Sequence, residues 1–312
     1  MFRFEQSSLE RSRRLLTAVA VVNRLPATLG YNLAYFLIGV ALAWSALPTA
    51  DLALVGWFGV AVMLAKMQAS VADAIHDREV DANNPEKSRI ARSVARIGRK
   101  RLWTLLVAEL AGAGVAFGVV AMRTGEPAVL ALGAAMVLLG FAYSYPPRLK
   151  ERGIVNHLVT TGVDVCFVLL PVPYLLAGGL TPRALVVGAI VALYAFAYHV
   201  VHQAADVYYD GQVGVATFAR SFGAPRTVAL AAWLSGTAAA LGTAAGYYPT
   251  ALALVVVTAH YATLYRRVAE TSVERQSTVI AARFDIGVVA SVLNLATAVS
   301  VLLDAGAVAV PV

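Results

Sequence analysis

Long apolar stretches alternate with short polar segments along nearly the whole chain. A helix needs about 20 mainly apolar residues to cross the hydrocarbon core of a membrane. Windows of this kind lie near 27–47, 52–76, 102–122, 127–145, 155–178, 183–207, 226–246, 249–268 and 284–305. The pattern predicts an all-α integral membrane protein, a bundle of about nine transmembrane helices. The count falls to eight if the window near 249–268, which contains His260, does not span the membrane.

The composition agrees with this pattern, because 59% of the 312 residues are hydrophobic and only 14% are charged. A soluble globular domain carries far more charge. The single cysteine, Cys166, cannot form a disulfide within the chain and gives no sign of an oxidising compartment. Polar residues precede the first apolar window, which is the wrong order for a cleavable signal peptide, so the first apolar helix is expected to be retained.

The basic residues predict the orientation. The N-terminus and the loops after the second, fourth, sixth and eighth windows hold all but three of the 25 Lys and Arg residues, the exceptions being Lys66, Arg123 and Arg183. By the positive-inside rule these segments are cytoplasmic in a multi-pass protein of the cell membrane, and the C-terminus lies outside. Topology and contact with anionic lipid headgroups account for the net charge of +7, so nucleic acid is not expected as a partner.

A row of carboxylates ends the second window. The stretch Asp73-Ala-Ile-His-Asp77-Arg-Glu-Val-Asp81 spaces three aspartates four residues apart, which places them on one face of a helix. Like charges at this spacing repel each other unless a cation or water lies between them. The alternative is a plain solvated helix end.

The same spacing recurs after the sixth window as Asp206-Val-Tyr-Tyr-Asp210, and 206 − 73 and 210 − 77 both give 133. Because four crossings separate the two clusters, both are expected on the cytoplasmic side. The equal offset suggests one 1–312 domain built from duplicated halves, roughly 25–150 and 151–312. Mg²⁺ prefers carboxylates together with the phosphate oxygens of a substrate, so two facing clusters predict a Mg²⁺-diphosphate site. A chance repeat of two solvated helix ends is the alternative.

Basic residues that could balance a diphosphate stand beside the clusters: Arg78, Lys87, Arg89, Arg148 and Lys150. The positive-inside rule alone would also place them there. The last two follow the stretch Tyr143-Ser-Tyr-Pro-Pro, whose paired prolines end a helix and would direct these side chains. A plain helix-ending turn would look the same.

Three polar residues are predicted to lie deeper than topology requires. Lys66 precedes Asp73 by two helical turns, Asp164 interrupts an apolar window, and His202 precedes Asp206 by one turn. Ionisable groups within a membrane usually face a cavity or a partner. Lys66 and Asp164 are therefore candidate acceptor-side residues, or an ion pair with each other, and His202 orients a carboxylate or the acceptor, or is a bystander.

Taken together, these motifs resemble the UbiA superfamily of intramembrane prenyltransferases over nearly the whole chain. The family's motifs are Asn-Asp-x-x-Asp-x-x-x-Asp, a Tyr-Ser-x-Pro-Pro stretch followed by Lys, and Asp-x-x-x-Asp-x-x-x-Gly-x-x-Thr. The last is complete here as Asp206, Asp210, Gly214 and Thr217, and Asn23-Arg24-Leu-Pro26 resembles the family's start.

The chain departs from the family in three places. Asp73-Ala74 replaces the leading Asn-Asp, Val215-Ala216 lacks the basic residue that often precedes the threonine, and Arg89-Ile90 replaces a usual Arg-Pro.

The resemblance implies a central cavity with two Asp-rich motifs on its cytoplasmic side. The implied activity is Mg²⁺-dependent transfer of a prenyl group from an isoprenyl diphosphate to a lipophilic acceptor, which is an aromatic compound, a quinone precursor or another isoprenoid. The implied catalytic residues are Asp73, Asp77, Asp206, Asp210, Lys150 and Tyr143, and Asp81 joins the four aspartates as a metal ligand. The implied substrate-binding residues are Asn23, Arg24, Arg78, Lys87, Arg89, Arg148, Lys66, Asp164 and His202. The alternatives are a terpene cyclase of the same architecture and, more remotely, a cation-binding transporter.

Overall fold

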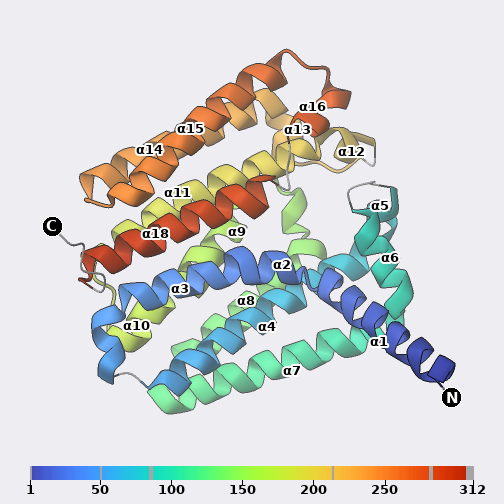
Figure 1. Ribbon diagram of the computed structural model, residues 1–312, viewed down its shortest axis with the longest axis horizontal. Helices are drawn as coiled ribbons and strands as arrows, with labels where there is room; N and C mark the ends of the chain where they lie inside the picture. Colours follow the sequence, from blue (N-terminus) through green and yellow to red (C-terminus); the bar gives the residue numbers. More distant parts are fainter. Residues whose placement is uncertain (1, 50, 84–86, 213, 281–283, 307–312) are drawn as a thin grey trace. The chain divides into compact units, whose positions relative to one another are not determined.

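The computed structural model of the chain describes residues 2–49, 51–83, 87–212, 214–280 and 284–306. Within these ranges every regular element is a helix, and no strand is present (Figure 1). The predicted all-α fold class is therefore confirmed.

Six helices of the described residues are long and apolar enough to cross a membrane. They are α4 (Leu52–His76), α7 (Arg99–Thr124), Ile154–Ala177, α11 (Pro182–Ala205), α14 (Ala224–Ala244) and Gly287–Asp304. Two shorter apolar helices are Thr28–Leu42 and α8 (Ala128–Ser144), and α15 (Tyr248–Ala269) covers the window that contains His260. Each predicted window thus coincides with helix, and the count of nine crossings stays a prediction.

Three of these apolar helices contain a π-helical turn. Thr28–Leu42 joins η1 (Thr28–Asn32) to α3 (Leu33–Leu42), and Ile154–Ala177 joins α9 (Ile154–Gly162), η4 (Val163–Leu169) and α10 (Pro171–Ala177). Gly287–Asp304 combines the end of η5 (Asp285–Val289) with α18 (Ala290–Asp304). Such turns are rare in proteins, and those that occur often lie at functional sites.

Local chemistry sets the helix ends. Thr181 caps α11, because its hydroxyl accepts a hydrogen bond from the Ala184 N–H at 3.2 Å, and Pro182 follows at the first helical position. Gly125 ends α7 with a φ of 71°, in the left-handed region that favours glycine. The helix limits therefore follow from the sequence.

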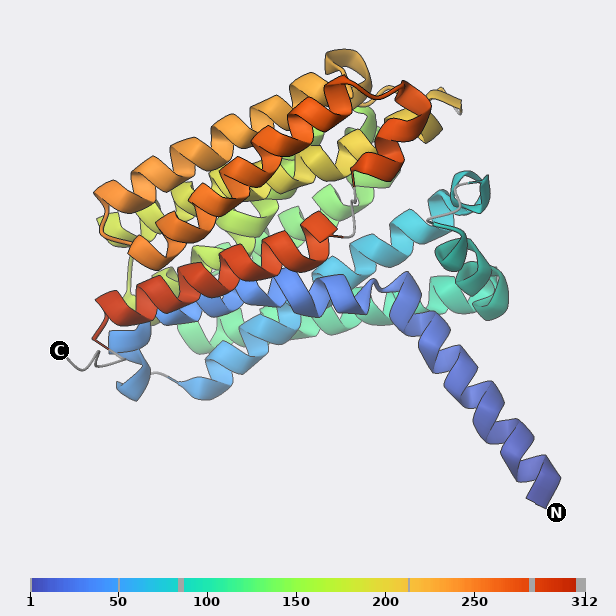
Figure 2. The same ribbon diagram turned by 45° about the horizontal axis from the view of Figure 1, so that its top comes forward.

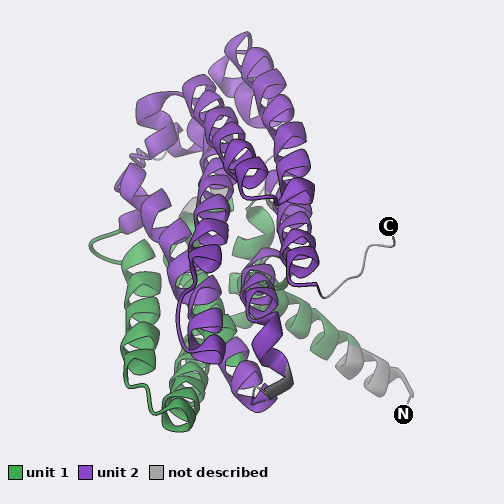
Figure 3. Cartoon of the chain, turned by 90° about the vertical axis from the view of Figure 1, so that its left-hand side faces the viewer, with its two compact units in different colours: residues 1–29, 60–148 green, residues 30–59, 149–312 purple. Residues whose placement is uncertain are grey.

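The chain forms two compact units, coloured separately in Figure 3. Unit 1 contains residues 1–29 and 60–148, and unit 2 contains residues 30–59 and 149–312. The boundary near residue 148 falls close to the predicted midpoint of the chain, but residues 30–59 belong to the second unit. The internal duplication stays a prediction.

In unit 1, a buried apolar cluster joins α1 (Phe2–Val22), α4, α6 (Ser88–Ile97) and α7. It includes Ala18, Val71, Ala74, Val94 and Leu102. Short α2 (Leu25–Ala27) follows α1, and α5 (Arg78–Asn83) follows α4. The cluster fixes the part of α4 that leads into the first aspartate motif.

In unit 2, α14 packs against both α11 and α15, so these three helices lie side by side in Figures 1 and 2. The helix α18 contacts α15 and α3, and α3 also contacts η4. Gly39 permits this last approach, because a Cβ there would collide with the Leu169 carbonyl oxygen. The remaining elements are η2 (Trp44–Thr49), η3 (Leu149–Glu151), α12 (Val207–Gln212), α13 (Phe218–Phe222) and α16 (Val273–Val279).

Candidate active site

The first aspartate motif lies where a long apolar helix gives way to a short one. The helix α4 ends at His76, Asp77 occupies a bend, and α5 begins at Arg78. The backbone N–H of Asp77 donates to the Asp73 carbonyl at 2.8 Å, and that of Asp81 donates to the Asp77 carbonyl at 2.8 Å. The predicted one-turn spacing is therefore present, although the helix is interrupted at the middle aspartate.

Asp73 is buried and held by two side chains of unit 1. The Arg24 Nη2 donates to Asp73 Oδ2 at 2.5 Å, and the Ser144 hydroxyl donates to Oδ1 at 2.6 Å. Arg24 stands at the break between α1 and α2 with a φ of 48°, and Ser144 is the last residue of α8. Asp73 thus ties together three helices that are distant in sequence. Ser144 was missed by sequence reasoning, although it belongs to the quoted Tyr-Ser stretch.

Asp77 and Asp81 differ in their surroundings. His76 Nδ1 lies 2.8 Å from Asp77 Oδ1, and the His76 ring contacts Tyr145 at a centroid distance of 5.1 Å. Asp81 is 3% exposed, and within the described part of the chain its Oδ2 has no hydrogen-bond partner. Burial raises the pKa of Asp81 from 3.8 to about 6, opposed by the nearby Lys87 ammonium. A buried acceptor of this kind suits a cation.

Tyr143 belongs to the same group of charged side chains as the first motif. Tyr143 is half-buried and interacts electrostatically with Asp73, Arg24, Lys87 and Asp77. These five residues therefore form one cluster.

Four further predicted side chains of this unit have other surroundings. Arg78 is exposed and pairs with Glu79 at 3.0 Å, and Arg89 is exposed on the first turn of α6. Asn23 is fully buried, and its Nδ2 donates to the Val19 carbonyl at 3.2 Å. Lys66 is half-buried on α4.

The predicted proline turn spans the unit boundary. Arg148, the last residue of unit 1, is half-buried with a φ of 57°, and Lys150, in η3 of unit 2, is also half-buried. Arg148 thus has a left-handed backbone, and the direction that the paired prolines were expected to give both side chains stays a prediction.

The second aspartate motif repeats the local structure of the first. In unit 2, α11 ends at Ala205, Asp206 occupies a turn, and α12 follows from Val207. The Asp210 N–H donates to the Asp206 carbonyl at 2.8 Å, and both carboxylates are half-buried. Each motif thus places an aspartate at the break after a long apolar helix and another one turn later.

Arg220 fixes the loop that follows Asp210. Its Nη1 donates to the Val215 carbonyl at 2.6 Å and reaches the Asp210 carbonyl at 3.4 Å. Gly214 has a φ of 74° in this loop, and the Thr217 side chain caps α13. The guanidinium group therefore covers the segment where the expected basic residue is replaced by Val215-Ala216. Sequence reasoning missed Arg220, since only the fold of α13 returns it to this loop.

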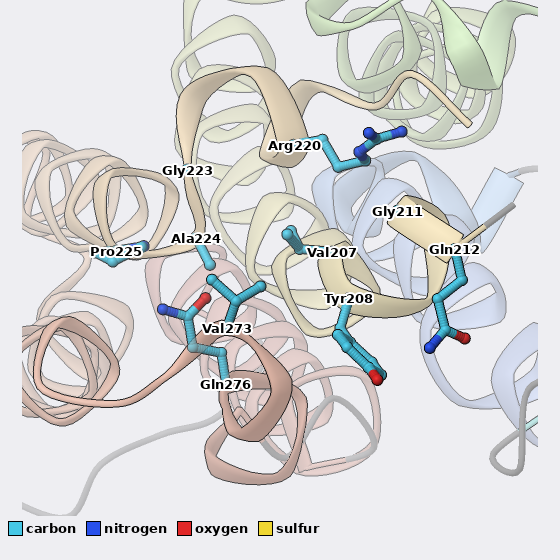
Figure 4. Close-up of a pocket in the computed structure, with 10 residues that line it drawn as sticks. All are labelled: Val207, Tyr208, Gly211, Gln212, Arg220, Gly223, Ala224, Pro225, Val273 and Gln276. Carbon is cyan, nitrogen blue, oxygen red and sulfur yellow. The ribbon is translucent and has the colours of Figure 1, made fainter. Parts of the chain in front are cut away.

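A pocket of about 530 Å³ adjoins α12 (Figure 4). Val207, Ala224 and Val273 line it together with Gln276, whose Nε2 donates to the Val268 and Thr271 carbonyls at 3.3 and 3.2 Å. The hollow is mainly apolar and lies beside the second motif.

The deeper polar residues of unit 2 pair with each other. Asp164, in η4, faces His199 of α11, with Oδ2 and Nε2 separated by 3.9 Å. One turn nearer the aspartates, His157 Nε2 lies 3.0 Å from Gln203 Oε1. His202 is half-buried and interacts with His157. His199 and Gln203, both on α11, thus each pair with a polar residue of the preceding apolar helix, His199 with Asp164 and Gln203 with His157.

In the described residues, no group of three or more His, Cys, Asp or Glu side chains could hold a metal ion by itself. A cation at either motif would therefore need ligands beyond that motif. Mg²⁺ is usually bound in this way, by one or two carboxylates together with water and substrate phosphates.

The comparison with known proteins decides the family. The model of the UbiA prenyltransferase family matches residues 32–302. The chain belongs to this family. It is therefore a prenyltransferase-family enzyme and a multi-pass membrane protein. No curated protein sequence matches the chain.

Solved structures share the UbiA fold at low sequence identity. A UbiA homolog from Archaeoglobus fulgidus, bound to GPP and Mg²⁺, is 15% identical with a TM-score of 0.63, covering 91% of this chain and 99% of that one. A digeranylgeranylglyceryl phosphate synthase is 15% identical with a TM-score of 0.62, covering 94% and 99%. The apo UbiA homolog from Aeropyrum pernix K1 is 18% identical with a TM-score of 0.58, covering 87% and 98%. At these identities the likeness shows the fold.

Proposed function

We propose that this protein is a Mg²⁺-dependent prenyltransferase that ionises an allylic isoprenyl diphosphate and transfers the prenyl group to a lipophilic acceptor in the membrane. The observation that carries the proposal is the repeated local structure of the two motifs. In unit 1 the Asp81 N–H donates to the Asp77 carbonyl, and in unit 2 the Asp210 N–H donates to the Asp206 carbonyl, each at 2.8 Å. Both pairs lie just beyond a long apolar helix.

The proposal assigns Asp77, Asp81, Asp206 and Asp210 as the main metal ligands. The buried Oδ2 of Asp81 fits this role, because it has no hydrogen-bond partner among the described residues. Asp73 stays a predicted ligand, but a contact with Mg²⁺ would compete with its bonds to Arg24 and Ser144. Bound Mg²⁺ would stabilise the negative charge that develops on the departing diphosphate. The structures of a relative with GPP and with DMAPP, each together with Mg²⁺, support the use of Mg²⁺ with an isoprenyl diphosphate.

The chain's own side chains supply the rest of the site. The proposal assigns Lys87, Arg148 and Lys150 to neutralise diphosphate oxygens. Lys87 is near Asp81, and Tyr143 lies within the field of the first motif. In the proposed arrangement nine apolar helices exclude water from the allylic cation, and the active-site loops face the cytoplasm with the N-terminus. Lys66 and His202 stay candidates for contacts with substrate.

The decisive experiment is incubation of purified protein with allylic diphosphates of several lengths and Mg²⁺, with pyrophosphate and prenylated products measured by mass spectrometry. Excess chelator should abolish pyrophosphate release, and Mg²⁺ should restore it. Asp77→Ala and Asp210→Ala should each lose on the order of a hundredfold, the usual effect of removing a main electrostatic contributor. Glu79→Gln is the matched control, because that side chain is 83% exposed on the same short helix as Asp81.

Two results would contradict the proposal. Full activity in excess chelator would remove the Mg²⁺-diphosphate site. Conversion of one diphosphate into a cyclic hydrocarbon or alcohol, without any acceptor, would replace transfer by cyclisation.

A further inference from the structure

A histidine and a buried carboxylate face each other inside unit 2. Asp164 is 1% exposed, and its Oδ2 lies 3.9 Å from His199 Nε2. This separation exceeds a hydrogen bond, but pairs of this kind often tighten only when substrate is bound. A charged carboxylate at this depth is costly, which makes a functional role for the pair the first hypothesis.

Aromatic rings from the same unit surround the histidine. The Tyr198 ring lies 4.6 Å from the His199 ring, and the Tyr31 ring lies 6.4 Å from it. Tyr31 and Asp164 both belong to π-helical turns, η1 and η4. Two uncommon turns thus present polar side chains to one histidine, while the rings offer faces that can stabilise a nearby cation.

The pair also stands at a defined depth below the second aspartate motif. His199 precedes Asp206 by seven residues, which is two helical turns and about 10 Å along the helix, on the same face. Backbone bonding continues into the motif, because the Asp206 N–H donates to the Gln203 carbonyl at 3.0 Å. A diphosphate held at Asp206 with its chain directed into unit 2 would bring the first prenyl carbons toward His199.

The proposed reaction must release a proton. When an acceptor carbon or oxygen bonds to the prenyl cation, the adduct loses a proton to become neutral. A cation without an acceptor becomes neutral by losing a proton to give an olefin, or by adding water and then losing a proton from the oxygen to give an alcohol.

We propose that His199 is the base that accepts this proton and that Asp164 positions it; this rests on the proposed function. Asp164 faces Nε2, which favours the tautomer with hydrogen on Nε2 and leaves the lone pair on Nδ1 as the basic site. The C1–O bond of the donor breaks, and its electron pair leaves with pyrophosphate. In the acceptor-free reaction a C–H bond beside the cation gives its electron pair to a new double bond. The proton passes to Nδ1, and Asp164 stabilises the resulting imidazolium.

Product partition tests this role with one probe. Geranyl diphosphate and Mg²⁺ are supplied without acceptor, and olefin from proton loss is measured against alcohol from water capture. In His199→Ala the ratio of olefin to alcohol should fall about a hundredfold or more, the scale of a lost general base, while pyrophosphate release changes by less than about threefold. Added imidazole should restore olefin in this variant. Asp164→Asn should lower the ratio without rescue by imidazole.

The control is His260→Ala, another histidine of unit 2, on α15, which should keep the wild-type ratio. The ratio is independent of how much protein folds, so poor yield does not obscure it. An unchanged ratio in His199→Ala, or wild-type protein that forms alcohol only, would overturn the proposal. Absence of pyrophosphate release from geranyl, farnesyl and geranylgeranyl diphosphates would instead refute the proposed function.

Discussion

The replacement Asp81→Asn should stabilise the metal-free protein while it impairs the metal-bound one. Asp81 is 3% exposed, and its Oδ2 has no hydrogen-bond partner in the described ranges. Burial raises its pKa from 3.8 to about 6. Because the unfolded chain ionises at the lower pH, the native state loses stability as the pH rises through 6. The difference between the two pKa values corresponds to about 3 kcal/mol at pH 8.

The expected gain is smaller than this value, because a buried amide without partners costs about 1–3 kcal/mol. With a central cost of about 2 kcal/mol the net effect is about 1 kcal/mol, or a rise in melting temperature of on the order of 3 °C. The assay is thermal unfolding in detergent with chelator at pH 8 and at pH 5. The advantage of Asp81→Asn should disappear at pH 5, where the wild-type carboxyl is mostly protonated. Added Mg²⁺ should raise the wild-type melting temperature more than that of the variant.

Glu79→Gln removes a carboxylate from the same short helix, where the side chain is 83% exposed, and should leave the melting temperature unchanged. A lower melting temperature for Asp81→Asn in chelator at pH 8 would refute the reasoning. So would an advantage that is equal at both pH values, since it could not arise from ionisation.

Two further predictions concern topology and the altered first motif. Tags at the N-terminus and near Arg92 should be cytoplasmic and a tag after Val312 should be outside, as measured by accessibility in intact cells; both termini on one side would exclude nine crossings. Ala74→Asp should lower the free energy of unfolding by about 3 kcal/mol and so reduce the yield of folded protein, because Ala74 is 0% exposed within the apolar cluster of unit 1. Ala74→Ser should lower it less. Folding of Ala74→Asp at the wild-type level would show that the new carboxylate reaches polar surroundings.

The features that sequence predicted are those with short-range causes. Apolar windows of membrane length became helices, and aspartates four residues apart became neighbours one turn apart. The paired prolines lie just beyond the end of α8 at Ser144, as expected. Such signals depend on a few adjacent residues, so a single sequence contains them.

The features that sequence missed depend on contacts between distant residues. Ser144 reaches Asp73 across 71 positions, and Arg24 reaches it across 49. The apolar surroundings of Asp164 in the sequence led to the prediction that it faces the acceptor or pairs with Lys66. In the structure Asp164 faces His199. The π-helical turn that contains Asp164 alters the register of the helix, and no periodicity of 3.6 residues predicts the outcome.

The altered first motif illustrates how one residue of displacement changes a site. The family places a carboxylate three residues before the middle aspartate, whereas this chain has Ala74 there and Asp73 one position earlier. At about 100° per residue, the carboxylate moves from one side of Asp77 to the other. On its new side it meets the Arg24 guanidinium and the Ser144 hydroxyl, while Ala74 joins the apolar cluster. The displaced charge is therefore neutralised within the protein, and in the proposed site diphosphate binding in unit 1 would depend chiefly on Asp77 and Asp81.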